Sequence, residues 1–228
     1  MSTIGRLNET DLHEQLKHLL AGDDGLTEQD LDGFVVDVVR GDELIEIQTR
    51  GLLKLRRKLQ ALCDRHRIRI VHPIAAETII TRLTASGETA SSRRSPRRGR
   101  VEEIFRELTS LAGLLPHDRI TVEVALVRVI ETRVDDGRGS WRRRGVSIVA
   151  RRLDSIVATH ELRTAHDYLS LLPHDLAEPF SNTDVMQAAA LRYRDAQPIT
   201  SALRKMGLLR IAGVRGRERL YERVEPGA

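Results

Sequence analysis

Two acidic residues on neighbouring strand-like segments are the part of this chain best suited to chemistry. The stretch "GFVVDVVRGDELIEIQT" (33–49) alternates apolar and polar residues around Gly41-Asp42, a dipeptide that favours a two-residue hairpin turn. Counting outward from this turn pairs Asp37 with Glu46 and puts both on one face with Gln48. Opposed carboxylates about 5 Å apart repel each other. The pairing therefore predicts a bridging divalent cation, and Mg²⁺ commonly binds one or two carboxylates together with water and phosphate.

A helix is predicted before the hairpin, over residues 8–22. Asn8 or Thr10 would cap its first turn, Gly22 would end it, and Glu14 lies within it. Its apolar face consists of four leucines: Leu12, Leu16, Leu19 and Leu20.

After the hairpin, residues 51–67 predict an amphipathic helix with leucines at helical spacing. The single cysteine, Cys63, lies in this segment and is predicted to be a core residue, which excludes a disulfide framework and a Cys-based zinc site. "IRIVHPI" (68–74) predicts a short buried strand that ends at Pro73. The order helix, hairpin, helix, strand is that of a compact α/β unit.

This order of elements, together with the D-x8-E-x-Q string of the hairpin, resembles the PD-(D/E)XK nuclease superfamily, which includes Holliday-junction resolvases and restriction endonucleases. The resemblance covers roughly residues 8–75 and implies a core of order α-β-β-β-α-β. It implies that Asp37 and Glu46 bind Mg²⁺ or Mn²⁺, with Glu14 as a further ligand through water, and that the metal assists phosphodiester hydrolysis. The structural alternative is an edge-strand ion pair between Asp37 and Arg40.

The chain departs from this family at two places. Gln48 stands where the family has a catalytic lysine, and either Lys58 or Lys54 on the following helix is the alternative source of that cation. The segment "DDGLTEQDLD" (23–32), where the first of the three core strands is expected, is predicted to be a loop or short linker. The resemblance therefore leaves open whether the site is active.

Arginine carries most of the positive charge. The chain has 37 Lys and Arg residues against 33 Asp and Glu, yet only four of the 37 are lysines. Arginine suits contact with phosphate and with guanine edges. One arginine cluster falls in residues 84–100, which are predicted to be a mobile loop because they contain almost no large apolar residue. The arginines of the central part that are predicted to contact nucleic acid are Arg93, Arg94, Arg97, Arg98, Arg142 and Arg143.

The middle of the chain predicts further α/β structure. Residues 101–115 predict a helix and residues 119–134 a long strand. Residues 145–157 fit either a partner strand or a helix, and the pattern does not separate the two.

The C-terminal part predicts a winged helix. Residues 181–192 predict a helix with Ser181 and Asp184 at capping-box spacing, and a second helix ends at Gly207. Two strands around a Gly/Arg tip follow, which completes the helix, turn, helix, wing order. The residues predicted to contact DNA are Arg194, Gln197, Thr200, Arg204, Arg215 and Arg217. A protein-interaction module is the alternative interpretation.

Together these patterns predict an α/β protein with a PD-(D/E)XK-like mixed sheet over residues 1–160 and a winged-helix domain over residues 161–228. The predicted function is a Mg²⁺- or Mn²⁺-dependent DNA endonuclease in restriction, defence or repair. The alternative is a catalytically inactive DNA-binding protein or winged-helix regulator, and an RNA-processing nuclease differs only in substrate. Seven aromatic residues in all favour duplex DNA over stacked single strands. A polar N-terminus and the lack of long apolar runs predict a cytoplasmic protein without a membrane partner, and pairing as a homodimer would let two sites cut two strands.

Overall fold

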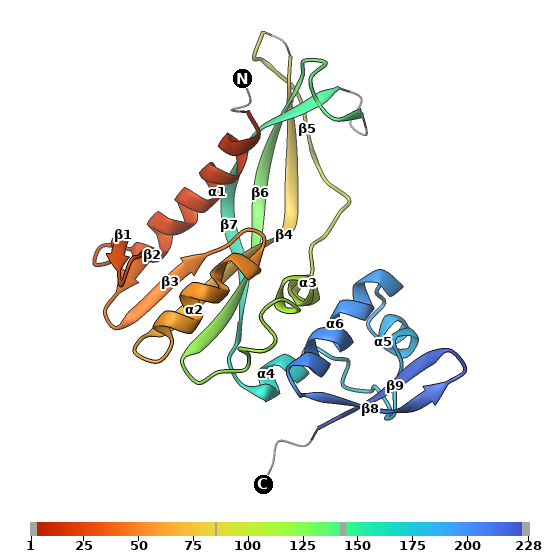
Figure 1. Cartoon of the computed structure of the whole chain (residues 1–228). Coiled ribbons are helices and arrows are strands. Elements are labelled where there is room, and N and C mark those ends of the chain that lie inside the picture. Colours follow the sequence, from red (N-terminus) through yellow and green to blue (C-terminus); the bar gives the residue numbers. More distant parts are fainter. Residues whose placement is uncertain (1–3, 85, 142–144, 225–228) are drawn as a thin grey trace. The chain divides into compact units, whose positions relative to one another are not determined.

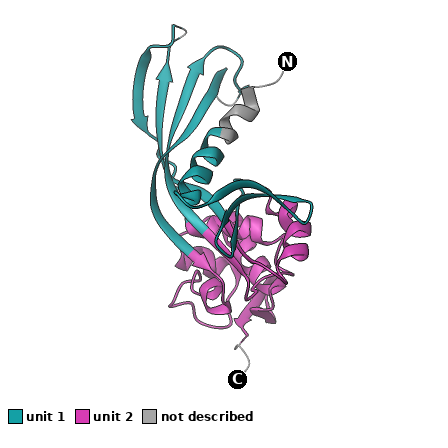
Figure 2. Cartoon of the chain, turned by 90° about the vertical axis from the view of Figure 1, so that its left-hand side faces the viewer, with its two compact units in different colours: residues 1–49, 71–100, 124–160 teal, residues 50–70, 101–123, 161–228 magenta. Residues whose placement is uncertain are grey.

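The computed structural model describes residues 4–84, 86–141 and 145–224, and the chain forms two compact units (Figure 1). Unit 1 comprises residues 1–49, 71–100 and 124–160 (Figure 2). Unit 2 comprises residues 50–70, 101–123 and 161–228. Each unit is therefore assembled from segments that are distant in sequence.

A large mixed sheet with helices confirms the predicted α/β class. Its strands follow the order β1-β2-β3-β4-β6-β7, with β5 paired to β4. They are β1 (Leu26–Leu31), β2 (Phe34–Arg40), β3 (Glu43–Ile47), β4 (Arg67–Leu83), β5 (Thr89–Arg94), β6 (Ile120–Asp135) and β7 (Val146–Leu162). The first helical elements are α1 (Ile4–Ala21), the 3₁₀ turn η1 (Leu52–Leu55), α2 (Arg56–Leu62), the 3₁₀ turn η2 (Val101–Ile104) and α3 (Phe105–Leu108). The C-terminal elements are α4 (Ala165–Leu169), α5 (Asn182–Ala188), α6 (Tyr193–Lys205), β8 (Leu209–Arg215) and β9 (Glu218–Arg223).

The β2–β3 hairpin has the predicted register. Val38 pairs with Ile45 and Arg40 with Glu43, and Gly41 adopts the positive φ of 59° that a primed turn requires. The apolar face of the hairpin is buried as predicted: Val36, Val38, Ile45 and Ile47.

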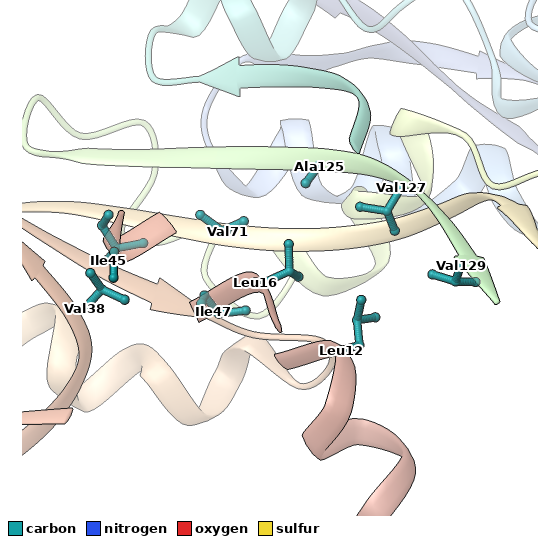
Figure 3. Packing of buried hydrophobic residues seen from close by; sticks show 10 residues of the cluster. Leu12, Leu16, Val38, Ile45, Ile47, Val71, Ala125, Val127 and Val129 are labelled. Atoms are coloured by element: carbon teal, nitrogen blue, oxygen red, sulfur yellow. The ribbon is translucent and has the colours of Figure 1, made fainter. Parts of the chain in front are cut away.

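One face of the sheet in unit 1 packs against α1 (Figure 3). The cluster joins residues of the helix to residues of four strands: Leu12, Leu16, Ala21, Val38, Ile45, Ile47, Val71, Ala125, Val127 and Val129. Leu16 is fully buried, and burying a leucine contributes about 1.5–3 kcal/mol. Leu19 was expected on the same face but is 56% exposed, so the prediction for this residue is wrong. The helix also begins at Ile4, upstream of Asn8 and Thr10, so neither residue is its N-cap.

The prediction of a loop or linker over residues 23–32 is wrong, because this segment contains β1. The strand pairs antiparallel with β2 from Leu26 opposite Val39 to Leu31 opposite Phe34. Asp32 and Gly33 form the turn, both with positive φ (51° and 78°). Alternate residues of this edge strand are exposed, so it needs few apolar residues. For this reason the composition of the segment did not indicate a strand.

Strand β4 continues through Pro73 instead of ending there, so the prediction of a short strand is wrong. Val71 accepts the backbone N–H of Gln48 (3.0 Å), and Ala75 accepts that of Gly99 (3.0 Å). Alternate residues of a strand direct their backbone groups to the same side, so Pro73 lies between these two bonds. It is therefore placed where β3 has ended and no ladder bond requires its missing N–H.

The Arg-rich segment 84–100 is not a loop throughout, because β5 runs antiparallel to β4 within it. All six residues of β5 are exposed, so the strand has no apolar face that the sequence could reveal. The predicted helices over 51–67 and 101–115 are both shorter, each consisting of a 3₁₀ turn followed by a short α-helix. Cys63 is buried as predicted.

The long strand predicted over 119–134 is confirmed as β6, and the open choice at 145–157 is resolved as strand β7. A buried carboxylate joins these two strands. The Glu131 side chain, 4% exposed, accepts hydrogen bonds from Arg151 (2.6 Å) and Arg133 (2.7 Å). Burial alone would raise the pKa of Glu131, but the bonds with Arg151 and Arg133 hold it below its usual value.

Glu131→Gln should destabilise the protein by on the order of 3 kcal/mol at pH 7, because removing one partner of a buried ion pair leaves the other partners uncompensated. A depressed carboxylate pKa gives stability that is present above the unfolded value of about 4.3 and lost as the pH falls through the lower folded value. The difference in the free energy of unfolding between wild type and variant should therefore become smaller below about pH 4. Denaturant unfolding at several pH values measures this difference. A difference that stays constant with pH would contradict the role of Glu131 as an ionised partner of Arg151 and Arg133.

The C-terminal elements of unit 2 form a helix–helix–hairpin arrangement. Helix α5 begins with a capping box in which Ser181 and Asp184 bond each other's backbone N–H groups, as predicted. Strands β8 and β9 form a two-stranded antiparallel sheet, and Phe180 bridges to Tyr221 of β9. None of the helices in the described ranges is long and apolar enough to cross a membrane.

Candidate functional site

The carboxylate of Asp37 is held at the point where the β2–β3 ladder ends. Its Oδ2 accepts the backbone N–H of Ile47 at 2.8 Å, next to the last ladder pair of Val38 and Ile45. The same oxygen lies 3.3 Å from Nε2 of His13, which α1 contributes. Asp37 remains 22% exposed, so its carboxylate is fixed in direction but reachable from solvent.

Helix α1 presents His13, not Glu14, to this carboxylate. Leu12 and Leu16 are buried, and His13 follows directly beside their stripe. Glu14 points further from the core and is 42% exposed. The hydrogen bond with Asp37 raises the pKa of His13, although burial opposes it, so the two groups form an ion pair toward neutral pH. Sequence reasoning missed His13, although the spacing of the leucines could have indicated it.

A second network on α1 holds Glu14. Lys17 is buried, and its ammonium donates to Glu14 (2.7 Å) and to Glu28 of β1 (2.7 Å). Burial would lower the pKa of Lys17, but these two bonds raise it. The bond with Lys17 lowers the pKa of Glu14. The structure therefore engages Glu14 with Lys17.

Glu28 occupies the position of β1 that faces Asp37, between the pairs Thr27–Val38 and Gln29–Val36. Glu46 follows Ile45, the last residue of β3 in the hairpin ladder, and Asp37 precedes its partner Val38. Glu46 is only 3% exposed, between the buried Ile45 and Ile47. Glu28 was missed because its segment was predicted to be a loop.

Gln48 follows Glu46 at the end of β3 and is half-buried. Its backbone carbonyl accepts a hydrogen bond from Nδ1 of His72 (2.6 Å), and its N–H bonds Val71, so Gln48 joins β3 to β4. Lys54 and Lys58 belong to unit 2, on η1 and α2. In the described part of unit 1 the lysine is Lys17, which lies on α1 four residues after His13.

The donor chemistry of Asp37 and Glu46 fits Mg²⁺, which binds through one or two carboxylates and completes its octahedron with water and substrate phosphate. Within the described ranges, no group of three or more His, Cys, Asp and Glu residues converges as a metal-ligand set. The described residues therefore do not form an all-protein cage such as a structural zinc site.

A polar stripe runs along the outer face of α6. Arg194, Gln197 and Arg204 are exposed at helical spacing, and Lys205 extends the stripe. Thr200 lies on the inner face instead: it is 1% exposed and donates its hydroxyl to Oδ1 of Asn182 (2.6 Å). The prediction that Thr200 contacts DNA therefore does not match its buried position. Lys205 was not predicted, although its helical spacing from Arg194 and Gln197 would have placed it on the outer face.

The arginines of the β8–β9 hairpin have different roles. Arg215 of β8 donates to Asp184 (2.6 Å) and to Oγ of Ser181 (3.0 Å), so it ties the hairpin to the N-terminus of α5. The backbone N–H of Ser181 and the Arg215 guanidinium hold the pKa of Asp184 below its usual value. Arg217 is exposed at the tip of the hairpin.

The remaining predicted contacts lie in unit 1. The side chains of Arg93, Arg94, Arg97 and Arg98 are all exposed, on β5 and directly after it. Arg142 and Arg143 lie outside the described residues.

A family model described as "Domain of unknown function (DUF8091)" matches residues 10–163. An uncharacterized protein of Treponema pallidum (strain Nichols) is 32% identical over 235 residues, which cover 99% of this chain and 89% of that protein. No solved structure matches the chain.

Proposed function

We propose that this chain, which belongs to the family described as "Domain of unknown function (DUF8091)", is a metal-dependent DNA endonuclease. The observation that carries the proposal is that Asp37 of β2 and Glu46 of β3 directly adjoin Val38 and Ile45, the last pair of the hairpin ladder. The order α1-β1-β2-β3-α2-β4 supports it, because it is the α-β-β-β-α-β order that the nuclease resemblance implies. The presence of β1 supplies the strand that the sequence pattern lacked.

In this proposal Asp37 and Glu46 hold the cation, and the Ile47 N–H keeps the Asp37 carboxylate in one orientation. A bound Mg²⁺ neutralises phosphate charge and lowers the pKa of a coordinated water. His13 compensates the charge of Asp37 when no cation is present, through the 3.3 Å contact. Positioning of this kind is the main contribution that a protein makes to metal-assisted phosphoryl chemistry.

The C-terminal helix–helix–hairpin arrangement supports a winged-helix DNA-binding role. Helix α6 would be the recognition helix, because its outer stripe combines arginines with Gln197 and its inner face is buried. The exposed Arg217 at the hairpin tip would contact the phosphate backbone.

One observation favours a second candidate, a DNA-binding protein without nuclease activity. Gln48 occupies the lysine position of the nuclease pattern, and a neutral amide cannot offset charge in the transition state. In this candidate the pair of His13 and Asp37 would be a structural ion pair on the sheet.

Cleavage of labelled duplex, single-stranded and branched DNA by the purified protein, in Mg²⁺, in Mn²⁺ and in EDTA, separates the two candidates. The nuclease proposal expects cutting of at least one DNA in the presence of either cation and none in EDTA. Binding without cutting in every condition would support the second candidate instead. Comparison of nicked with fully cut duplex reports whether one or two sites act on each molecule.

A further inference from the structure

We infer that Trp141, in the turn between β6 and β7, stacks on an unpaired base of DNA. The inference rests on the proposed DNA-binding function and names its substrate class: DNA with at least one unpaired base, such as a single strand or a gapped duplex. The small number of aromatic residues favoured duplex DNA in the sequence analysis. One exposed indole is nevertheless sufficient to stack on one base.

Trp141 has the highest exposure among the large hydrophobic side chains in the described part of the chain. Its exposed fraction is 83%, whereas Tyr168, Phe105 and Phe180 are fully buried. It is also the single tryptophan of the sequence. Tryptophan is highly buried on average because its ring system has a large apolar surface. The exposure of this residue is the observation that carries the inference.

Backbone bonds close the turn directly beside Trp141. The N–H of Gly139 donates to the carbonyl of Gly145 (2.8 Å), and the N–H of Gly145 donates to the carbonyl of Ser140 (3.4 Å). The two sides approach so closely that a Cβ on Gly139 would lie 1.9 Å from the carbonyl oxygen of Val146. Figure 1 shows this turn at the end of the neighbouring strands β6 and β7. Trp141 therefore extends into solvent from a turn whose base is fixed.

The residues around Trp141 in the sequence are mostly basic. The carboxylate of Asp136 accepts the backbone N–H of Arg138 (3.0 Å) and the hydroxyl of Ser147 (2.7 Å), which joins the two sides of the turn. The side chain of Arg138 is exposed. Residues 136–144 contain four arginines and one acidic residue. A phosphate backbone that passes the turn would meet this charge while one of its bases contacts the indole.

The composition of the turn favours a base over the other partners that bind exposed tryptophan. Residues 135–140 are Asp, Asp, Gly, Arg, Gly and Ser, so no further apolar side chain precedes Trp141 in the turn. A protein partner or a lipid surface requires a wider apolar patch, because binding strength at both depends on buried apolar neighbours. A base requires only one aromatic face, and every base has a face that stacks.

Base pairing determines which DNA offers such a face. A base within a continuous duplex is covered by its neighbours, and opening a base step costs unstacking energy. This cost is smallest for a base that is already single-stranded. Contact through Trp141 therefore favours single strands and gaps over continuous duplex.

Three substitutions of Trp141 separate stacking from simple apolar contact. Trp141→Phe keeps an aromatic face, Trp141→Leu keeps an apolar side chain without such a face, and Trp141→Ala removes both. The affinity of each variant for a single strand, a gapped duplex and a continuous duplex is measured in EDTA. Because Trp141 is exposed, we expect melting temperatures equal to that of the wild type, which establish that the variants fold.

The single tryptophan also makes the fluorescence of the wild-type protein a direct probe of this residue. The protein is titrated with the same three DNAs and, separately, with vesicles of phosphatidylcholine and phosphatidylserine. Stacking on a base should quench the indole emission with the single strand and the gapped duplex, and less with the continuous duplex.

Trp141→Ala and Trp141→Leu should bind the single strand and the gapped duplex about 5–150-fold more weakly, which is the effect of one lost stacking contact. Both should bind continuous duplex as the wild type does. Trp141→Phe should retain most of the affinity for unpaired DNA.

Unchanged affinity of Trp141→Ala for unpaired DNA, or equal weakening by Trp141→Phe and Trp141→Leu, would overturn the inference and leave the proposed DNA binding in place. A blue shift with vesicles but no quenching by DNA would assign the turn to a lipid surface instead. Absence of binding to every DNA would overturn the DNA-binding function and the inference with it. Stacking by a protein that does not cut DNA would contradict only the nuclease proposal.

Discussion

Asp37→Asn should lower metal-dependent DNA cleavage by roughly 100-fold or more, since a bound metal supplies several kcal/mol of charge stabilisation and 1.36 kcal/mol corresponds to tenfold in rate. The asparagine oxygen can still accept the Ile47 N–H, which is 2.8 Å from Oδ2 in the wild type. The variant therefore removes the charge of the carboxylate while preserving its structural bond. Initial cleavage rates in Mg²⁺ and Mn²⁺ measure the effect.

Glu46→Gln should show a loss of the same order, because the two carboxylates would bind one cation together. Asp30→Asn on β1 is the matched control: Asp30 is exposed, and its Oδ1 accepts the Gly33 N–H (3.2 Å), a bond that asparagine also keeps. DNA binding in EDTA should be unchanged in all three variants. Cleavage at the wild-type rate by Asp37→Asn would show that the hairpin is not the active site.

Replacing Arg194 and Arg204 together with alanine should weaken DNA binding by about 10–100-fold and reduce the salt slope by close to 2, since each contact with phosphate contributes about 0.9 to that slope. Both side chains are exposed on the outer face of α6, so their loss leaves the helix packing intact. Titration of duplex DNA at several salt concentrations measures both quantities.

Thr200→Val on the same helix provides the contrast. It removes the hydroxyl bond to Asn182 and should cost about 1 kcal/mol of stability without changing the salt slope. A slope that fell in Thr200→Val but not in the double arginine variant would show that the outer stripe of α6 does not face DNA.

The turn of the β2–β3 hairpin and the three pairs beside it could be predicted because local chemistry determines them. Gly41-Asp42 selects the turn, the turn sets the register, and alternation separates the buried face of Val38 and Ile45 from the face of Asp37. The capping box of α5 was predictable for the same reason, since Ser181 and Asp184 lie three residues apart. In both places the decisive interactions are made between residues close in sequence.

Features that depend on distant pairing were not predictable in this way. Strand β5 has no apolar face, and only its ladder with β4 makes it a strand. Pro73 usually indicates a strand end, but the end of β3 removes the need for a ladder bond there. His13 was overlooked because its importance comes from a contact with Asp37, 24 residues away. Asp32-Gly33, by contrast, is a hairpin signal that the acidic character of β1 concealed.

Binding of Mn²⁺, followed by its electron paramagnetic resonance signal in the presence of duplex DNA, tests most directly the claim that Asp37 and Glu46 hold a divalent cation. The proposed site predicts a bound Mn²⁺ in the wild type and in Asp30→Asn, and its loss in both Asp37→Asn and Glu46→Gln. Mn²⁺ binding that survives both substitutions, or that is absent from the wild type, would contradict the claim.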